Sequence, residues 1–505
     1  MTNTWKKVGA ISLAAVMLAG SLAGCGKKAA SIDPENPEIT IMTKAFNAES
    51  ASPDSPVTKA LEDFVGSKLN IQWIPTSGYD EKVTAAMGSG EYPQVMLVGS
   101  RSSSVIQNSR AGTFWDITDK LTDAEKFPNL AKTNPNVNHN ISIDGRVYGL
   151  YRARTIGRAG VSIRKDWLDN LNLEMPKTVD DLYNVMKAFK EQDPDKNGQD
   201  DTFGMIITNY IDGPLNNLAI WMGAPNQWGV NEETDELEPM QATEGFKDAL
   251  DFLRKCYAEG LINQDMATYD SEKWNEQFLQ SKAGIIIDVA DRARRLAQNM
   301  QASVPEAVVD VFGYVTKDAN TEPRTLPTTG YDGYYVFPKS AIPTEEDLDF
   351  VLGVMDKCNE QEALNLMNYG IEGRSYSIEN GHVVKVEDSA IKNEYNDLNQ
   401  FSTGIVATDL TVAYSTDVAE KIDQVYKDNE VWAIPNPAEP YVSNTYSTKG
   451  PQLDAIIAEA NTKYIVGQIS WEDWQAQYDR WMSQGGADII KEMNEAYKAD
   501  KSIQK

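Results

Sequence analysis

The sequence is poor in the side chains that carry most enzyme catalysis. Its 505 residues include 3 cysteines and only 2 histidines, His139 and His382, which lie far apart in the chain. Zinc catalysis and Ser-His or Cys-His nucleophile chemistry are therefore poorly supported. Two of the cysteines, Cys256 and Cys358, each continue an apolar helical stripe. We predict that both are buried thiols and that no disulfide joins them.

Positive charge is also scarce. Lys and Arg number 47 against 75 Asp and Glu, which gives a net charge of −28. So acidic a chain repels nucleic acid and anionic lipid, and we expect neither as a partner. Beyond the N-terminal region, no apolar run approaches the roughly 18 residues of a membrane-spanning helix. The length exceeds what one hydrophobic core supports, so two or more lobes are expected.

The first 25 residues have the pattern of an export signal. Lys6 and Lys7 precede an apolar run from Val8 to Leu22, which ends in Leu22-Ala-Gly-Cys25. This ending resembles the lipobox of bacterial lipoproteins, in which cleavage leaves a lipidated cysteine. We therefore predict a signal peptide over 1–24, lipidation of Cys25 and a flexible tether over 25–38. The alternative is an ordinary secretory cleavage site that happens to contain a cysteine.

Short strands and helices alternate from Ile39 onward. This βαβαβ order predicts an α/β fold with a parallel sheet and right-handed crossovers. Ligands of such sheets collect beyond the carboxyl ends of the strands, so three segments are candidates for ligand contact: 43–50, 77–79 and 100–104. The strands predicted here are Ile39–Met42, Ile71–Ile74 and Gln94–Val98, with a helix over Asp80–Met87.

A calcium-loop pattern lies between a predicted helix and a predicted strand. Oxygen-bearing side chains occupy positions 1, 3, 5 and 9, a glycine occupies position 6, and a backbone carbonyl is available at position 7. Position 12 is Gly204, where an EF-hand has a bidentate glutamate. The sequence thus predicts a structural Ca²⁺ site, and the alternative is a solvated turn that caps the helix. The predicted ligands are Asp193, Asp195, Asn197, Gln199 through its carbonyl, and Asp201.

Several further motifs resemble one protein family. The chain is similar to the bacterial family 1 extracellular solute-binding proteins, and within them to the LipO/LplA-like lipoprotein branch related to alginate-oligosaccharide-binding proteins. That branch also has a DPD-x-NG calcium loop. The motifs that carry the resemblance are Ser89-Gly90-Glu-Tyr-Pro-Gln94-Val95, Asp144-Gly-Arg-Val-Tyr-Gly149, Arg164-Lys-Asp-Trp-Leu168, Asn368-Tyr-Gly-Ile-Glu-Gly373 and Trp471-Glu-Asp-Trp474.

The resemblance implies a two-lobed, type II periplasmic-binding-protein-like fold with a ligand cleft between lobes joined by hinge strands. Our markers for the crossings between lobes are 148–156, the strand 283–288 and 330–338. They predict a first lobe of 39–150 plus roughly 284–337. The second lobe, which contains the calcium loop, would then be 151–283 plus roughly 338–505.

Candidate ligand residues are aromatic and polar side chains in suitable settings. Sugars present an apolar CH face and a rim of hydroxyls, which suit aromatic rings and a few polar groups. For each tryptophan the alternative is packing in the core, which we assign to Trp167, Trp471, Trp474 and Trp481. The candidates are Trp221 and Trp432 in Gly/Pro/Asn-rich surroundings, Tyr331, Asp332 and Tyr335 on a glycine-flanked strand, and Trp274 on a helix.

Arginines cluster near two predicted crossings, and Arg292 is the strongest candidate because it follows the end of a strand. Such groups can bind a carboxylate bidentately, which would suit uronic-acid oligosaccharides. The alternative is that they pair with neighbouring acids such as Asp288 or Asp291. The clusters comprise Arg152, Arg154 and Arg158, and Arg292, Arg294 and Arg295.

The resemblance implies a substrate-binding lipoprotein that captures an oligosaccharide by hinge closure and delivers it to the permease subunits of an ABC importer. We expect a monomer, without catalytic activity, on the extracellular face of a Gram-positive cell membrane. One alternative is an oligopeptide-binding protein of the same fold. The other is an extracellular glycoside hydrolase or polysaccharide lyase. Glycoside hydrolysis requires two paired carboxylates, and no motif nominates such a pair.

Overall fold

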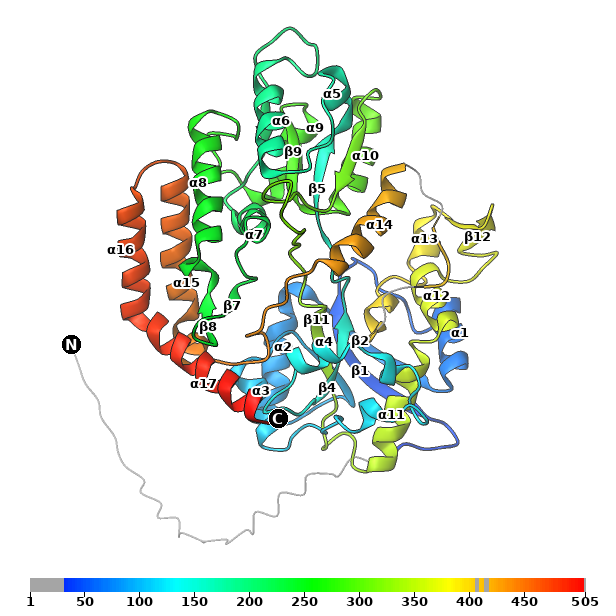
Figure 1. Ribbon diagram of the computed structural model, residues 1–505. Helices are drawn as coiled ribbons and strands as arrows, with labels where there is room; N and C mark the ends of the chain where they lie inside the picture. Colours follow the sequence, from blue (N-terminus) through cyan, green and yellow to red (C-terminus); the bar gives the residue numbers. More distant parts are fainter. Residues whose placement is uncertain (1–30, 405–407, 413–416, 504–505) are drawn as a thin grey trace, which may run out of the picture.

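The computed structural model describes residues 31–404, 408–412 and 417–503. Two α/β lobes lie one above the other, and the C-terminal helices run along one side of both (Figure 1). The predicted signal peptide, Cys25 and the start of the predicted tether, up to residue 30, lie outside the described residues. None of the described helices is both long and apolar enough to cross a membrane.

The first lobe contains a five-stranded sheet in the order β2-β1-β3-β11-β4. The prediction of parallel strands holds for β1, β2 and β3, whereas β11 runs antiparallel to both β3 and β4. The strands are β1 (Glu38–Ala45), β2 (Lys68–Pro75), β3 (Val95–Val98), β4 (Gly149–Ala153) and β11 (Tyr331–Val336). The helices of this lobe are α1 (Pro56–Val65), α2 (Thr76–Ser89), α3 (Ser103–Arg110), α4 (Pro135–Asn140), α11 (Glu345–Lys357), α12 (Gln361–Tyr369) and α13 (Ser389–Lys392), and a small hairpin joins β12 (Tyr376–Glu379) to β13 (His382–Lys385).

The second lobe contains a four-stranded mixed sheet in the order β10-β5-β9-β6. Helix α6 begins at the predicted capping box, in which Thr178 and Asp181 bond reciprocally. The strands are β5 (Ala159–Arg164), β6 (Phe203–Met205), β9 (Ala283–Val289) and β10 (Val309–Phe312). The helices are α5 (Lys165–Asn170), α6 (Val179–Glu191), α7 (Asp212–Trp221), α8 (Glu244–Ala258), α9 (Trp274–Leu279), α10 (Arg292–Ser303) and α14 (Asp417–Val431).

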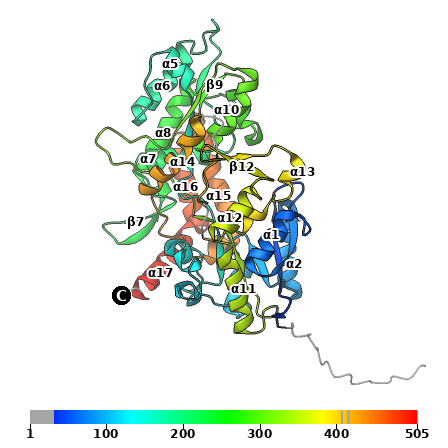
Figure 2. The ribbon, with the colours of Figure 1, turned by 90° about the vertical axis from the view of Figure 1, so that its right-hand side faces the viewer.

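Three helices and a hairpin extend the second lobe toward the first. Helix α15 packs on α8, and α17 then turns back across the molecule to the first lobe (Figures 1 and 2). There the Asp500 carboxylate lies 3.3 Å from His139 Nε2. These elements are the hairpin of β7 (Trp228–Asn231) and β8 (Glu236–Pro239), with α15 (Asn444–Ile465), α16 (Trp471–Trp481) and α17 (Ala487–Ile503).

The predicted division into lobes differs from the observed one in two places. Strands β9 and β10 belong to the second sheet, so 284–312 lies in the second lobe and β9 is not a crossing. Conversely, Ile342, Leu352 and Phe401 are buried in the core of the first lobe, to which 338–401 belongs. Alternation of strands and helices shows that a strand exists, but it does not show which sheet the strand joins. That depends on partners far away in the sequence, such as β5 for β9.

The predicted state of the two cysteines is confirmed. Cys256 on α8 and Cys358, which follows α11, are free and buried in separate cores. Burial raises the pKa of each thiol to about 12, so neither is a thiolate near neutral pH.

Helix α14 holds two segments that connect the lobes. The side-chain amide of Asn429 donates to the carbonyls of Gly157 (3.0 Å) and Ala159 (2.7 Å), just before and at the start of β5. Its own backbone carbonyl accepts from the Thr325 hydroxyl (2.6 Å), in the segment between β10 and β11. A Cβ on Gly313 would lie 2.0 Å from Asn429 Oδ1, so only glycine permits this approach.

We expect Asn429→Ala to lower the free energy of unfolding by about 1–3 kcal/mol, because two carbonyls at a buried site would lose their donor. The measurement is urea denaturation followed by tryptophan fluorescence. Exposed Lys427, on the same helix, provides the control: Lys427→Ala should change stability by about 0.5 kcal/mol or less. Equal stability of the two variants would show that Asn429 does not hold the crossings.

Candidate ligand cavity

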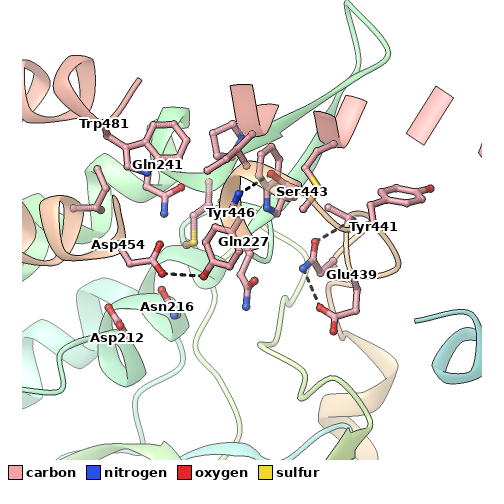
Figure 3. Close-up of a pocket in the computed structure, with 18 of the residues that line it drawn as sticks. Asp212, Asn216, Gln227, Gln241, Glu439, Tyr441, Ser443, Tyr446, Asp454 and Trp481 are labelled. Carbon is pink, nitrogen blue, oxygen red and sulfur yellow. Dashed lines mark hydrogen bonds between the residues drawn. The ribbon is translucent and has the colours of Figure 1, made fainter. Parts of the chain in front are cut away.

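A cavity of about 740 Å³ lies between the second lobe and the edge of the first. The second lobe provides most of its wall, from the start of α7, the β7–β8 hairpin, the segment before α15, and one face of α15 (Figure 3). The first lobe contributes Ser100 and Arg101, which follow β3, and Tyr331 at the start of β11. Of the three predicted contact segments, 100–104 thus reaches the cavity.

Polar side chains suited to hydroxyl groups gather on the second-lobe wall. Asp212 and Asn216 come from α7, whereas Gln241 follows β8 (Figure 3). On α15, the Tyr446 hydroxyl donates to Asp454 Oδ2 at 2.8 Å. Partial burial raises the pKa of Asp454, and burial together with the charge of Asp454 raises the pKa of Asp212.

Helix α15 is unusual where it borders the cavity. Pro451 lies within it and removes the helical donor to the Ser447 carbonyl, and both residues line the cavity. Ala455 and Ala458 follow on the same wall, so this face of the helix combines a carbonyl that lacks its helical donor with small side chains. Such a surface leaves room for a ligand to approach the helix closely.

Aromatic rings supply the apolar part of the wall. Trp228 lines the cavity from β7 and Trp481 from the end of α16. Trp481 is the last ring of a stacked series on α16, where it lies 5.4 Å from the Tyr478 ring. Gly486 lets the chain pass close to it, since a Cβ there would meet the Trp481 ring at 2.2 Å. The packing role predicted for Trp481 holds, yet the ring also faces the cavity.

The two lobes touch at one edge of the cavity. The Tyr331 hydroxyl donates to Glu439 Oε1 at 3.0 Å, and the Asn436 amide donates to Glu439 Oε2 at 3.3 Å. The Arg101 guanidinium donates to the backbone carbonyls of Glu439 and Pro440. Polar contacts therefore join the two lobes on this side of the cavity.

Among the predicted ligand residues, Tyr331 lines the cavity, but three other aromatics do not. Trp221, Trp274 and Tyr335 are at most 3 % exposed and lie in the cores of the lobes. The Tyr335 hydroxyl is 2.9 Å from Thr43 Oγ1, and Trp274 Nε1 donates to the Ile206 carbonyl. Proximity to Gly and Pro misled the assignment of Trp221, which ends a helix that is buried on most sides.

The other three predicted ligand residues, Arg292, Asp332 and Trp432, lie outside the cavity lining. Arg292 Nε donates to Asp288 Oδ2 at 2.8 Å, and its guanidinium lies 4.4 Å from the Trp274 ring centre. Asp332 accepts from Arg152 and Arg154. The alternative of pairing with local acids is thus the observed state of Arg292. Trp432 is partly exposed and is not among the lining residues.

Most of the residues that line the cavity were not predicted from the sequence. Trp228 lies in Asn226-Gln-Trp-Gly229, the same kind of surroundings that nominated Trp221 and Trp432, so that criterion could have found it. For α15 the available signal was an interior proline in a segment, Asn444–Asp454, that lacks a continuous apolar stripe. No sequence pattern marks Asp212 or Gln241.

The predicted calcium loop brings its oxygen-bearing side chains together. Asp193 accepts from the backbone N–H groups of Asn197 (3.1 Å) and Gly198 (3.0 Å), which folds the loop around this carboxylate. The Asn197 amide group donates to both Asp195 (2.9 Å) and Asp201 (3.2 Å). The Asn197 amide thus links the carboxylates of Asp195 and Asp201.

The carboxyl groups of the loop differ in their electrostatic surroundings. Partial burial, contact with the Asp193 carboxylate and the charge of Asp201 raise the pKa of Asp195. A hydrogen bond from the Lys282 ammonium lowers the pKa of Asp201. Among the described residues, no three His, Cys, Asp or Glu side chains converge closely enough to form a metal cluster. The donor set of carboxylate, amide and backbone carbonyl oxygens fits a hard cation in chemistry.

Comparison with known proteins identifies the family. The family model for bacterial extracellular solute-binding proteins matches residues 47–357. Lipoprotein LipO of Bacillus subtilis (strain 168) is 38% identical over 508 residues, covering 98% of this chain and 99% of that protein. The polygalacturonan/rhamnogalacturonan-binding protein YtcQ of the same organism is 33% identical over 511 residues, covering 99% and 100%.

Solved structures share the fold. A solute-binding protein of Bifidobacterium longum infantis, described as HMO-binding and ABC-transporter-associated, superposes with a TM-score of 0.69 at 19% identity, over 92% of this chain and 98% of that one. The alginate-binding protein AlgQ2 without calcium ion gives 0.63 at 18%, over 93% and 100%. An EF-hand mutant of Streptococcus pneumoniae FusA with fructo-nystose gives 0.60 at 18%, over 92% and 99%. The two-lobed fold was thus predicted correctly, and the chain belongs to the bacterial extracellular solute-binding proteins.

Proposed function

We propose that this protein is the substrate-binding component of an ABC importer and that it binds an oligosaccharide in the cavity between its lobes. The observation that carries the proposal is the combination of aromatic faces with side-chain amides and carboxylates in one inter-lobe cavity. Relatives named for polygalacturonan/rhamnogalacturonan binding and for fructooligosaccharide transport support a sugar rather than a peptide.

In this proposal the second lobe provides the primary contacts. Trp228 and Trp481 offer faces to the CH surface of the sugar rings. Asp454, Asn216 and Gln241 accept from or donate to hydroxyl groups. Tyr331 approaches from the first lobe, so a sugar that contacts both lobes stabilises their closed arrangement. Binding requires no covalent step, and the permease subunits of the importer would receive the sugar from the monomeric protein.

We expect Trp228→Ala to weaken binding of the co-purifying or best-binding oligosaccharide about 30-fold, because tryptophans at binding sites commonly contribute about 2 kcal/mol. Titration calorimetry measures this loss. Trp432→Ala is the matched control, since Trp432 does not line the cavity, and it should retain near wild-type affinity.

The proposal fails if no oligosaccharide binds, or if Trp432→Ala loses affinity while Trp228→Ala does not. Small-angle scattering adds a test of closure. Identical dimensions with and without a saturating sugar would contradict the hinge mechanism.

We further propose that the Asp193 loop binds a structural Ca²⁺. The ligands would be Asp193, Asp195, Asn197 and Asp201 with the Gln199 carbonyl, and the ion would neutralise carboxylates that now repel one another. Its place supports a structural role. Asp201 pairs with Lys282 beside the amino ends of the parallel strands β6 and β9, whereas cavity-lining Asp212 follows the carboxyl end of β6.

Chelation should therefore lower the melting temperature, because an ion that binds only the folded state adds about 2.7 kcal/mol at roughly 100 times its Kd. In Asp195→Ala the chelator should have no such effect, while sugar affinity changes little. Differential scanning calorimetry with and without Ca²⁺ provides the measurement. Unchanged melting of the wild type would disprove the site, and loss of sugar binding on chelation would assign the ion to the cavity instead.

We also propose that Cys25 is lipidated and anchors the protein to the outer face of the cell membrane of a Gram-positive bacterium. The supporting observations are the lipobox-like sequence and the similarity to a Bacillus lipoprotein. Two or three acyl chains on one residue suffice for stable anchoring, whereas a single chain binds only marginally.

Cys25→Ser should move the protein from the membrane fraction to the soluble fraction without changing its sugar affinity. Fractionation followed by immunoblotting measures the shift, and Cys256→Ser, at a thiol that is buried in the second lobe, should stay with the membrane. Retention of Cys25→Ser on the membrane would refute the anchor.

A further inference from the structure

The cavity carries an excess of negative charge. Among the described residues, its charged lining comprises the acids Asp212, Glu439 and Asp454 and the cation Arg101. Two of the carboxylates, Asp212 and Asp454, interact through space, since the charge of Asp454 contributes to the raised pKa of Asp212. With these groups ionised, the described lining of the cavity carries a net negative charge.

Arg101 already forms hydrogen bonds with the backbone of the protein. Arg101 directs both terminal nitrogens at the carbonyls of Glu439 and Pro440, so its bidentate face is turned to the backbone and away from a ligand. Glu439 in turn receives hydrogen bonds from neutral groups, the Tyr331 hydroxyl and the Asn436 amide. Hydrogen bonds to carbonyls leave the guanidinium charge of Arg101 in place, and the Glu439 carboxylate on the same edge offsets it.

The two carboxylates of the main wall remain unneutralised by the described chain. Asp454 receives its hydrogen bond from the neutral Tyr446 hydroxyl. The interaction that acts on Asp212 besides burial is the repulsive one with Asp454. A carboxylate in this position accepts hydrogen bonds from two hydroxyl groups at once, which suits a neutral sugar ring.

Five of the six arginines in the two predicted clusters pair with acids of the protein itself. Arg292 pairs with Asp288, and Arg158 pairs with Asp291. Arg152 and Arg154 share Asp332. Each of these arginines would have to leave its acidic partner before it could bind a uronate. The partner would then be an unpaired charge close to the uronate, which is unfavourable.

We propose that the cavity selects neutral oligosaccharides and discriminates against uronic-acid oligosaccharides. This inference rests on the proposed function and narrows its substrate class. A uronate in the cavity would place a third like charge beside Asp212 and Asp454, and like-charge contacts of this kind cost several kcal/mol. The specificity proposed here differs from that of the relative named for polygalacturonan and rhamnogalacturonan.

The test is a titration of the full-length protein against a panel of oligosaccharides in matched pairs. Each oligouronide is paired with its carboxyl-reduced form, which has the same linkage and length but no charge, and neutral hexose oligosaccharides of other linkages complete the panel. We expect the tightest ligand to be neutral. Any uronide that binds should do so at least about tenfold more weakly than its reduced partner.

Variants identify the charges responsible. Asp454→Asn and the double variant Asp212→Asn/Asp454→Asn should each lower the ratio of uronide Kd to neutral Kd, and the double variant more so. This ratio cancels any general weakening. Asp63→Asn, at an exposed site on α1, removes the same charge outside the cavity and should leave the ratio unchanged. Added salt should also lower the ratio in the wild type, because it screens repulsion.

The outcomes separate the inference from the function on which it rests. If a uronide is the tightest ligand, or if the double variant leaves the ratio unchanged, the charge-based selection is overturned while sugar binding stands. If nothing in the panel binds, the proposed function fails and the inference with it.

Discussion

The structure depends on how closely α14 can approach the segments that join the lobes. Asn429 is fully buried and holds the chain on both sides of the start of β5, while its backbone binds the segment that leads to β11. Glycines at 157 and 313 make this approach possible, since a Cβ on either would come within 2.2 Å of α14. The lobes are therefore linked by segments whose position is fixed by a few buried hydrogen bonds, and each of these bonds is hard to replace.

The cavity follows from this arrangement. One lobe provides most of the wall and the other contributes Arg101 and Tyr331 at its edge. This asymmetry agrees with the proposal that a ligand binds first to the second lobe. The elements around the cavity include a two-stranded hairpin and a helix in which Pro451 leaves the Ser447 carbonyl without its helical donor. Irregular backbone leaves polar groups available for recognition that regular elements would satisfy internally.

Charge distinguishes the two special sites of the molecule. In the Asp193 loop the carboxylates are drawn together by the backbone and share amide and ammonium partners, an arrangement that suits a cation. In the cavity, Asp212 and Asp454 belong to separate helices and face a volume large enough for several sugar rings, an arrangement that suits hydroxyl groups. Under the two proposals the same residue type would serve two kinds of site, a compact loop and the wall of an open cavity.

The sequence by itself determined features that depend on neighbours along the chain. The capping box of α6, the strands β1, β2 and β3, the burial of Cys256 and Cys358 and the folding of the loop around Asp193 all follow from local spacing. Motifs along the chain also indicated the family. Only the tertiary structure decided that β9 and β10 join the second sheet, that Trp221 and Tyr335 are core residues, and that Trp228, Asp212 and Asp454 meet around one cavity. Sheet membership and cavity lining arise from contacts between distant segments, and neither hydrophobic periodicity nor residue type encodes which distant segment will be the partner.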